Sequence, residues 1–374
     1  MKVALVHDWL NGMRGGEKVL EILCDIFPDA PIYTLFCDKD KLSQKLRERK
    51  IHTSILQKYP LVKRYYRYYL PLYPYAVKHI DVSEYDLIVS VSHCIAKAVK
   101  KRSDALHICY CNTPMRYVWG FADQYFGTGI KRKIINSTLN KLQKWDYATS
   151  GNVDFYIANS YNIKKRIYRC YQREADKVIY PPCDTDYFSP SDDSADYYLL
   201  VSALVPYKKI DIAVEAFNVL GYPLKIIGTG PEEQKLHKKA KSNITFLGWQ
   251  SDEEVRDHYR KCKAFIFPGE EDFGIVPLEA QACGRPVIAY GQGGVTETVI
   301  PHEKGYVPRD MSIKGESTGI LFENQTVKSL IDAVELFKQV SNDFNKENMR
   351  KHALSFSRQR CMDELRSYID DKIS

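Results

Sequence analysis

Short apolar segments alternate with longer amphipathic segments along the whole chain. The apolar segments are rich in β-branched and aromatic residues, which is typical of buried strands, and the amphipathic ones have helical spacing. The segments predicted as strands are 2–6, 30–36, 86–92, 105–111, 154–158, 197–202, 224–227, 243–246, 264–267 and 319–322. Alternating strands and helices form parallel sheets, so both halves of the chain are predicted to be Rossmann-like α/β domains.

A proline-rich segment separates the two halves. Three prolines lie within 181–190, and a polar stretch follows at 191–196. Domain boundaries lie in segments of this kind, where few contacts cross. The sequence therefore predicts a boundary near 181–195, with an N-terminal domain at 1–185 and a C-terminal domain at 186–357.

The segment 264–289 carries the clearest candidate chemistry. Its buried strand stops at a Pro-Gly pair, and Glu271 follows in the loop. A helix is predicted over 278–282, with Glu279 near its start. In open α/β sheets the carboxyl ends of the strands border the ligand crevice, so both carboxylates are expected to face it. Free N–H groups near the helix start would favour a diphosphate or a sugar hydroxyl. An ordinary strand–loop–helix unit with surface acids is the alternative interpretation.

A second candidate lies near the N-terminus, where a strand is followed by a Gly-rich turn and a helix. Gly12, Gly15 and Gly16 follow the strand 2–6, and the helix is predicted to begin near Glu17. This layout places backbone N–H groups at a helix start, as phosphate sites do. The glycines do not have G-x-G-x-x-G spacing, so a dinucleotide cofactor is not expected. A plain turn is the alternative.

Three phrases carry a family resemblance. Glu271-Asp-Phe-Gly-Ile-Val-Pro-Leu-Glu279, followed by Ala-Cys-Gly-Arg-Pro-Val-Ile, resembles the E-x7-E signature of retaining glycosyltransferases of family 4, which have the GT-B fold. The residues 11–18 resemble the first loop of family 4 enzymes that build bacterial surface polysaccharides. The residues 112–117 resemble the His-Thr-Pro-Met-Arg-Tyr segment of mannosyltransferases in O-antigen and capsule assembly. The resemblance covers essentially the whole chain.

The resemblance implies a fold and a reaction. In the GT-B fold two Rossmann-like domains face an interdomain cleft, and the C-terminal helix, here 358–374, packs back on the N-terminal domain. The implied reaction is retaining transfer of a sugar, with mannose from GDP-mannose as the nearest match. The implied acceptor is a lipid-linked glycan or an oligosaccharide in bacterial surface polysaccharide biosynthesis, including lipopolysaccharide. The nucleotide sugar and the acceptor are the expected partners, and no metal or other cofactor is expected.

The resemblance also implies roles for individual residues. The implied catalytic residues are Glu271, Lys208 and Asn112. The implied donor-binding residues are Gly15, Gly16, Lys208, Lys209, Phe273, Gly274, Ile275 and Glu279. The implied acceptor-binding residues are Asp8, Arg14 and Arg116.

The chain departs from the family pattern at two positions. Asn112 stands where the family has a histidine, and an amide can bond a sugar hydroxyl but cannot titrate. Ala203 stands five residues before Lys208, where the family usually has an arginine, and Lys209 is expected to supply the missing charge. These departures leave open a degenerate, non-catalytic sugar-nucleotide-binding protein. A UDP-sugar donor and a GT-B epimerase are further alternatives, although an epimerase would lack the E-x7-E phrase.

The segment 41–79 is basic and aromatic. It holds ten Lys or Arg residues and one acid, Glu48, with seven tyrosines among them. This composition suits an anionic membrane surface, from which a lipid-linked acceptor would be reached. Single-stranded nucleic acid could bind such a segment too, but nothing else in the sequence indicates nucleic acid, so none is expected. A solvated face is the alternative. Asp38-Lys-Asp40 spells the D-x-D of metal-dependent glycosyltransferases and is interpreted as a solvated charge run.

Composition limits the expected ligands and the expected location of the protein in the cell. The chain has 374 residues and a net charge of +7, which suits anionic ligands or membranes without choosing between them. Its ten cysteines form no C-x-x-C pair and are expected to be reduced thiols without zinc. No apolar run is long enough to span a bilayer, and the N-terminus does not resemble a signal peptide. We therefore expect a cytoplasmic protein that lies peripherally on the inner face of the cytoplasmic membrane.

Overall fold

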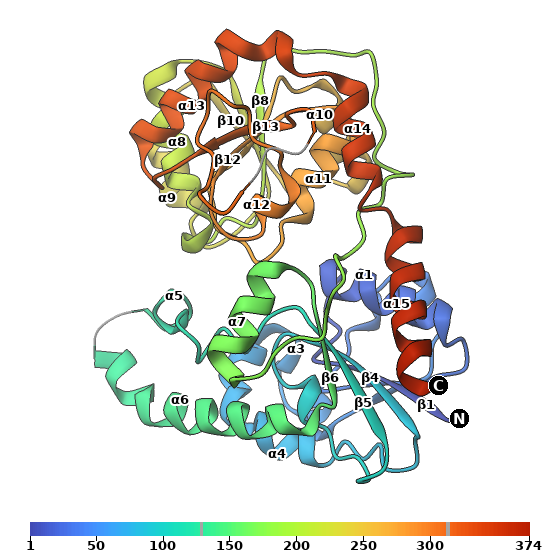
Figure 1. Cartoon of the computed structure of the whole chain (residues 1–374). Helices are drawn as coiled ribbons and strands as arrows, with labels where there is room; N and C mark the ends of the chain where they lie inside the picture. The colour runs from blue at the N-terminus through green and yellow to red at the C-terminus, as the bar shows by residue number, and fades with distance from the viewer. Residues whose placement is uncertain (128–129, 312–314) are drawn as a thin grey trace. The chain divides into compact units, whose positions relative to one another are not determined.

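The computed structural model describes residues 1–127, 130–311 and 315–374 (Figure 1). The chain divides into two compact units, one formed by Met1–Pro182 with Gln359–Ser374 and the other by Cys183–Arg358. Each unit is built on one parallel sheet with helices packed against it. The predicted fold class, α/β with two Rossmann-like domains, is therefore confirmed.

The N-terminal unit has a seven-stranded sheet with the order β3-β2-β1-β4-β5-β6-β7. Its strands are β1 (Val3–His7), β2 (Ile32–Thr34), β3 (Ile51–Thr53), β4 (Leu87–Ser92), β5 (Leu106–Cys111), β6 (Phe155–Ala158) and β7 (Lys177–Val178). The first six follow the doubly wound order 3-2-1-4-5-6, whose direction reverses between β1 and β4. The sequence did not predict β3 and β7, which contain no buried residue and so lack the apolar signal of a parallel strand.

The helices of this unit are α1 (Gly15–Ile26), α2 (Gln44–Arg47), α3 (Val62–Tyr65), α4 (Tyr73–Lys78), α5 (Ala122–Phe126), α6 (Ile130–Thr149), α7 (Tyr161–Tyr171) and α15 (Arg358–Ile373). Short 3-10 turns connect several of them. The Ser160 hydroxyl accepts a hydrogen bond from the N–H of Ile163 at 3.1 Å, which confirms the predicted N-cap of α7.

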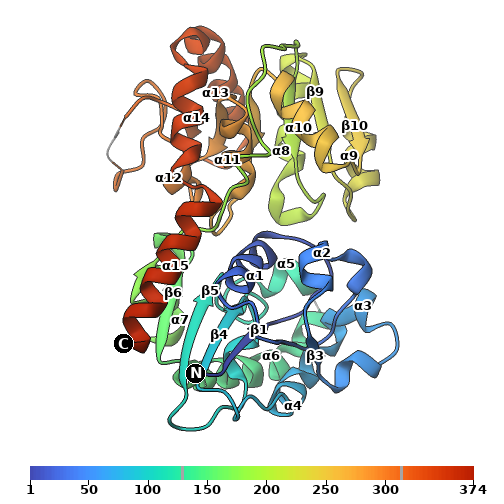
Figure 2. The ribbon, with the colours of Figure 1, turned by 90° about the vertical axis from the view of Figure 1, so that its right-hand side faces the viewer.

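The helix α15 belongs to the core of the N-terminal unit. Cys361, Leu365 and Ile369 recur every four residues along one face and are fully buried. They share a hydrophobic cluster with Leu20 of α1 and Ile108 of β5. Figure 2 shows α15 beside β5 and β6. The last helix therefore completes a core whose other members come from the first half of the chain.

The C-terminal unit has a six-stranded parallel sheet with the order β10-β9-β8-β11-β12-β13. Its strands are β8 (Tyr198–Val201), β9 (Leu224–Ile227), β10 (Ile244–Gly248), β11 (Phe265–Phe267), β12 (Val287–Tyr290) and β13 (Gly319–Phe322). Its helices are α8 (Ile210–Leu220), α9 (Glu233–Lys239), α10 (Asp252–Lys261), α11 (Ile275–Ala282), α12 (Val295–Thr298), α13 (Val327–Val340) and α14 (Lys346–Leu354). The order is again 3-2-1-4-5-6, and it reverses between β8 and β11.

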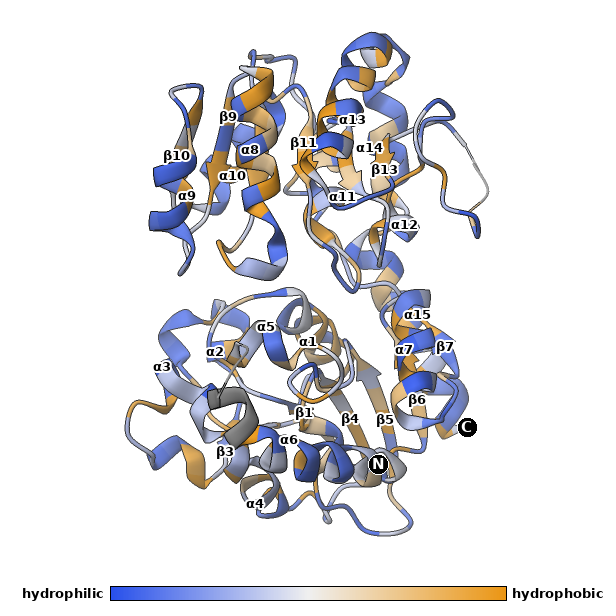
Figure 3. Cartoon of the chain, turned by 90° about the vertical axis from the view of Figure 1, so that its left-hand side faces the viewer, coloured by the Kyte–Doolittle hydropathy of each residue, from blue (hydrophilic) through white to orange (hydrophobic). Residues whose placement is uncertain are grey.

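The core of this unit lies between the sheet and two long helices. Val214 and Phe217 of α8 share a cluster with Leu330 and Val334 of α13 and with Ile266 of β11. Figure 3 shows hydrophobic residues along the strands and hydrophilic residues along the outer helix faces. Apolar strands and amphipathic helices thus follow one another along the chain, which is the pattern from which the strands were predicted.

All ten cysteines are buried free thiols. Burial raises the pKa of Cys24 to about 11 and that of Cys109 to about 12. The thiols are therefore protonated near neutral pH and pack as small apolar groups. Within the described residues, no cluster of three or more His, Cys, Asp or Glu side chains is placed to hold a metal ion. In that same part of the chain, no helix combines the length and the apolar character that crossing a bilayer requires.

His107 on β5 is a fully buried histidine. Its Nδ1 lies 3.2 Å from the carbonyl oxygen of Asn152, and its Nε2 lies 2.8 Å from the hydroxyl oxygen of Ser90. Nδ1 therefore donates to the carbonyl and Nε2 accepts from the hydroxyl, which is a neutral tautomer. Burial lowers the pKa of His107 to about 4.

We expect the N-terminal unit to lose stability as the pH falls from about 7.5 to about 5. In this range the unfolded histidine, with a pKa of about 6.5, takes up a proton and the folded one does not. The resulting loss is about 2 kcal/mol in the free energy of unfolding. Urea unfolding followed by tryptophan fluorescence measures it, because Trp9, Trp119 and Trp145 lie in this unit. His107→Gln cannot titrate and should reduce the pH dependence by that amount; an unchanged pH dependence would contradict the assignment.

Candidate functional site

The switch point of the C-terminal sheet brings two predicted site residues together. Lys208 lies in the loop after β8, and Glu271 lies in the loop after β11. The Lys208 ammonium donates a hydrogen bond to Oε1 of Glu271. Their side chains are 15% and 24% exposed, so the pair is accessible to a ligand. Open α/β sheets bind ligands at this point of the strand order.

Glycines set the position of the loop that carries Lys208. A Cβ on Gly228 would lie 1.9 Å from the carbonyl oxygen of Ser202, and a Cβ on Gly230 would lie 2.3 Å from that of Leu204. No residue with a side chain fits at these contacts, because the obstructing atoms belong to the backbone. The Leu204 N–H also donates to the carbonyl oxygen of Thr229 at 3.0 Å. The loops after β8 and β9 are therefore packed backbone against backbone.

A second glycine pair holds the loop that carries Glu271. A Cβ on Gly293 would lie 2.4 Å from the carbonyl oxygen of Glu271, and one on Gly294 would lie 2.2 Å from Cα of Phe273. The Gly294 N–H donates to the same carbonyl oxygen at 2.8 Å. This Gly-rich turn therefore supports the loop that carries Glu271.

A 3-10 turn, Pro206–Lys208, precedes α8, which begins at Ile210. Lys209 stands between the two with a φ of 56°, in the left-handed region. A non-glycine residue there costs roughly 1 kcal/mol or more and is maintained by its surroundings.

Glu279 lies in the second turn of α11 and is half-buried. Its Oε2 accepts a hydrogen bond from the hydroxyl of Tyr259 at 3.3 Å. Tyr259 comes from α10 and is fully buried, and burial together with the charge of Glu279 raises the pKa of its hydroxyl well above the usual value. The tyrosine therefore remains a donor at any physiological pH and fixes one oxygen of Glu279.

The helix α11 begins three residues before the predicted start at 278. Gly274 is its N-cap with a φ of 87°, and Pro277 lies in its first turn, where proline is tolerated because that position needs no intrahelical N–H bond. The backbone N–H groups of Ile275 and Val276 open the helix, as the sequence predicted. The Phe273 side chain, in contrast, is only 4% exposed and packs on Phe356 with ring centroids 6.0 Å apart. Phe273 can therefore contribute to a site through its backbone but not through its ring.

Asp8 differs most from its predicted role. Its carboxylate is fully buried and accepts hydrogen bonds from the backbone N–H groups of His93 at 2.6 Å, Ile95 at 2.5 Å and Ala96 at 2.7 Å. His93 Nδ1 lies 2.9 Å from the same carboxylate. Burial opposes ionisation, but His93 and these donors hold the pKa of Asp8 well below its usual range. The predicted acceptor contact is wrong, because Asp8 has no exposed atom and serves to hold the turn after β4.

Gly16 and Asn112 are brought together in the N-terminal unit. A Cβ on Gly16 would lie 3.0 Å from Nδ2 of Asn112 and 3.3 Å from Cε1 of His7. Gly16 thus lies against Asn112, so the structure brings these two predicted site residues side by side. Gly15 is the first residue of α1.

Glu17 is a buried acid that the site prediction missed. It lies 3.7 Å from Nε2 of the fully buried His7, and its Oε2 accepts from the N–H of Arg14 at 3.1 Å as part of a capping box. Burial opposes both charges, yet the contact raises the pKa of His7 and lowers that of Glu17. The spacing of Arg14 and Glu17 is the only sequence signal for this arrangement, since capping boxes place an acid three residues after the cap.

The two predicted acceptor arginines lie in different surroundings. Nη1 of Arg14 donates to Oδ1 of Asn11 at 3.4 Å. The guanidinium of Arg116 lies over the ring of Phe121 at 5.1 Å from its centroid, and Arg166 lies over the same ring at 5.0 Å. Arg116 is thus part of a cationic cluster formed by the loop after β5 and by α7.

Comparison with known proteins agrees with this geometry. Residues 187–353 match the family model described as glycosyl transferases group 1. The computed structure superposes on the crystal structure of Anabaena Alr3699/HepE in complex with UDP with a TM-score of 0.72 and 16% identity, covering 99% of this chain and 100% of that one. The chain therefore has the GT-B fold, and its region 187–353 is similar to the glycosyl transferases group 1 family.

Two relatives show how far the sequence similarity reaches. The chain is 28% identical to an uncharacterized glycosyltransferase of Methanocaldococcus jannaschii over 64% of this chain and 65% of that one. It is 34% identical to a GDP-mannose-dependent phosphatidylinositol monomannoside mannosyltransferase of Mycobacterium tuberculosis over 36% of each chain. The alignments thus span about two thirds and about one third of these relatives.

Gly294→Ala should destabilise the C-terminal unit. Gly294 has a φ of −67°, which any residue adopts, so only the clash of the new Cβ with the backbone of Phe273 matters. Overpacking of this kind typically costs roughly 1–3 kcal/mol. Calorimetric unfolding measures the loss, and Gly151→Ala is the control, because a Cβ there meets nothing within 4 Å. Equal melting temperatures for the two variants would show that the 271–273 loop yields to the added methyl group.

Proposed function

We propose that the protein is a glycosyltransferase that moves a sugar from a nucleotide sugar to a glycan acceptor. The observation that carries the proposal is the Lys208–Glu271 pair at the switch point of a group 1 domain. A nucleotide sugar presents a diphosphate next to sugar hydroxyls, so it can offer an anion to Lys208 and hydrogen-bond donors to Glu271. Each side chain would exchange its present partner for a ligand group of matching chemistry.

In the proposed reaction the bond between the anomeric carbon and the diphosphate oxygen breaks. An acceptor hydroxyl forms a bond on the same face of that carbon, and its proton passes to the departing diphosphate, so the configuration is retained. Lys208, Lys209 and the N–H groups at the start of α11 stabilise the charge that develops on the diphosphate. Glu271 binds hydroxyls of the donor sugar, and Glu279 accepts from the ribose hydroxyls. These cationic groups take the place of a metal ion, which the proposal does not require.

We propose mannose from GDP-mannose as the transferred sugar and its donor, as the mannosyltransferase relatives support. A UDP-sugar is the second candidate, favoured by the UDP bound in the structurally similar HepE. The proposed acceptor is a lipid-linked glycan of a bacterial surface polysaccharide. Asn112 and Ala203, which depart from the family pattern, favour the third possibility of a binding protein without activity.

Glu271→Gln should lower kcat by about 100-fold or more, because the amide no longer positions the donor sugar at the reacting carbon. Glu279→Gln should mainly raise the KM for the donor. The assay measures transfer from radiolabelled GDP-mannose and, separately, UDP-glucose to lipid-diphosphate acceptors. Glu270→Gln is the matched control, since Glu270 is the neighbouring carboxylate and is exposed.

The same assay tests the two remaining elements of the proposal. Transfer should persist in EDTA, and a loss that magnesium or manganese restores would contradict the metal-free reaction. Binding of a nucleotide sugar without transfer to any acceptor would favour the inactive binding protein. Full activity of Glu271→Gln would contradict the role of this carboxylate.

A lipid-linked acceptor requires access to a membrane, and the 61–75 surface supports such contact. Five apolar or aromatic side chains are exposed there at spacings of four and three residues: Leu61, Tyr65, Tyr68, Leu72 and Tyr75. Four residues between these positions face the core and are buried: Val62, Tyr66, Leu70 and Tyr73. One apolar face of this segment packs on the protein core, and a second apolar face is exposed to solvent. Such a segment can insert at the headgroup level of a bilayer.

The charge of the basic segment is smaller than its composition indicates. Lys41 and Lys63 pair with Asp38, and Lys45 pairs with Asp25, both acids that precede the segment. Other basic side chains, among them Lys58 and Arg64, remain exposed beside the apolar stripe. The proposed membrane contact therefore combines an apolar part with a reduced electrostatic part.

Liposome co-sedimentation should show binding that rises with the fraction of anionic lipid and falls with salt. Lys58→Ala with Arg64→Ala should weaken it by roughly 30-fold, at about 1 kcal/mol for each charge. Tyr68→Ser with Tyr75→Ser should remove the part of the binding that persists in high salt. Tyr168→Ser, an exposed tyrosine on α7, is the control. Sedimentation that ignores both lipid charge and these changes would make a soluble acceptor the better proposal.

A further inference from the structure

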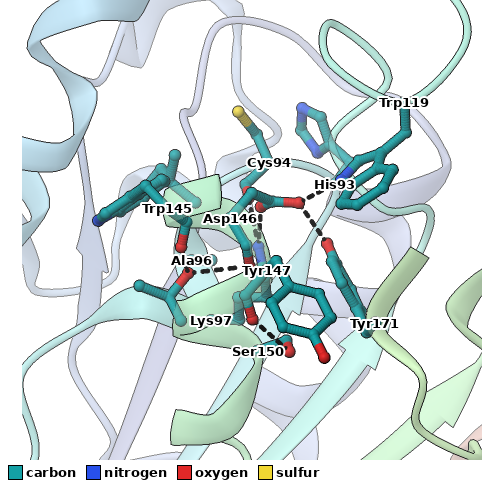
Figure 4. A network of polar contacts seen from close by, with 12 residues as sticks. His93, Cys94, Ala96, Lys97, Trp119, Trp145, Asp146, Tyr147, Ser150 and Tyr171 are labelled. Atoms are coloured by element: carbon teal, nitrogen blue, oxygen red, sulfur yellow. Dashed lines mark hydrogen bonds and ion pairs between the residues drawn. The ribbon is translucent and has the colours of Figure 1, made fainter. Parts of the chain in front are cut away.

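A buried ion pair lies in the N-terminal unit behind the loops that follow β4 and β5 (Figure 4). Asp146 is near the end of α6, and Lys97 lies in the 3-10 turn Ala96–Ala98. Their side chains are 0% and 1% exposed. The proposed transfer reaction uses neither residue, and Asp146 matches none of the family phrases.

The Asp146 carboxylate gathers donors from three separate elements. It accepts from the Lys97 ammonium on Oδ1, and on Oδ2 it accepts from Nε1 of Trp119 at 2.7 Å and from the Tyr171 hydroxyl at 2.9 Å. Lys97 donates also to the carbonyl oxygen of Cys94 at 3.1 Å. Figure 4 shows the indole and the phenol converging on the same carboxylate. Burial opposes the charge on Lys97, but the contact with Asp146 raises the pKa of its ammonium, so Lys97 stays charged.

Such a network is a poor source of net stability, because taking two charges out of water costs about as much as their attraction returns. A fully satisfied network instead specifies one arrangement of the groups that it joins. Here those groups are loops at the carboxyl edge of the sheet. Lys97 directly follows the turn 93–96, whose backbone N–H groups donate hydrogen bonds to Asp8. Trp119 is the last residue of the segment 112–119.

Side-chain hydrogen bonds hold the segment 112–119 near both of its ends, and Met115 and Tyr117, on either side of Arg116, are buried in the core. Asn112 is bonded through its carbonyl oxygen to Nδ2 of Asn159 at 3.1 Å and lies against Gly16. Thr113 contacts Nη1 of Arg166 at 3.2 Å. Beyond Arg116 the segment is held by the indole bond of Trp119 to Asp146 and by a hydrogen bond from Nε2 of Gln143 to the carbonyl oxygen of Val118 at 3.2 Å.

We propose that Asp146 is a positioning residue that, through Trp119, sets the place of Arg116 and thereby the binding of an anionic acceptor. The inference rests on the proposed transferase function and extends it to the acceptor. The donor contacts proposed for Lys208, Glu271 and Glu279 lie in the other unit and do not involve the network, so we expect Asp146 to affect mainly the acceptor.

Trp119→Phe and Tyr171→Phe form a matched pair, because each removes one hydrogen bond to the same oxygen of Asp146 and keeps an aromatic ring. Only Trp119 belongs to the segment that carries Arg116. Trp119→Phe should raise the KM for a lipid-diphosphate acceptor about tenfold, as expected for a lost bond to a charged group, and leave the donor KM unchanged. Tyr171→Phe should leave both KM values unchanged. Trp145→Phe, the same change on the residue before Asp146, is the second control.

Limited trypsin digestion gives a readout that does not depend on activity. Cleavage after Arg116 should be faster in Trp119→Phe than in the wild type and in Tyr171→Phe, because a released segment opens more often. Equal cleavage and equal acceptor KM values for the two variants would overturn the proposal and leave Asp146 as a packing residue. A wild-type protein that transfers no sugar would refute the proposed function alone, and the digestion would still decide the role of Asp146.

Discussion

Close backbone contact at the carboxyl edge of the C-terminal sheet is the constraint on which the candidate site depends. Four glycines allow the loops after β8, β9, β11 and β12 to touch through their main chains: Gly228, Gly230, Gly293 and Gly294. Each glycine pair therefore fixes one loop against its neighbour, and two of the loops fixed in this way carry Lys208 and Glu271. A single added methyl group would separate two loops, although none of these glycines provides a functional side chain.

The N-terminal unit holds the equivalent loops by another means. There two buried carboxylates hold the loops. Asp8 accepts hydrogen bonds from backbone N–H groups of the turn after β4, and Asp146 accepts them from side chains of three elements. Contacts of this kind are directional and require every donor to be present, since an unpaired buried charge is very costly. The loops at the carboxyl edge of the sheet are thus positioned by steric fit in the C-terminal unit, and by charge and hydrogen bonding in the N-terminal unit.

Local pattern was enough to predict most of the strands and the parallel sheets. It failed where a residue's role depends on distant partners. The N–H groups bonded to Asp8 lie 85 or more residues further along the chain, and the acids that neutralise part of the segment 41–79 lie before it. The burial of Phe273 against Phe356 depends on the turn between α14 and α15, more than eighty residues away. Short strands such as β3 carry too few buried residues to produce a periodic signal.

The placement of α15 has a consequence for the order in which the protein folds during synthesis. The C-terminal unit occupies a continuous stretch, Cys183–Arg358, inside a unit whose two parts flank it. A ribosome thus delivers every residue of the inserted unit before it delivers Cys361, Leu365 and Ile369, which the core of the other unit requires. Domains fold as their residues emerge. The unit encoded first is therefore the last to be completed, and until then the part of its core that α15 covers stays exposed to water.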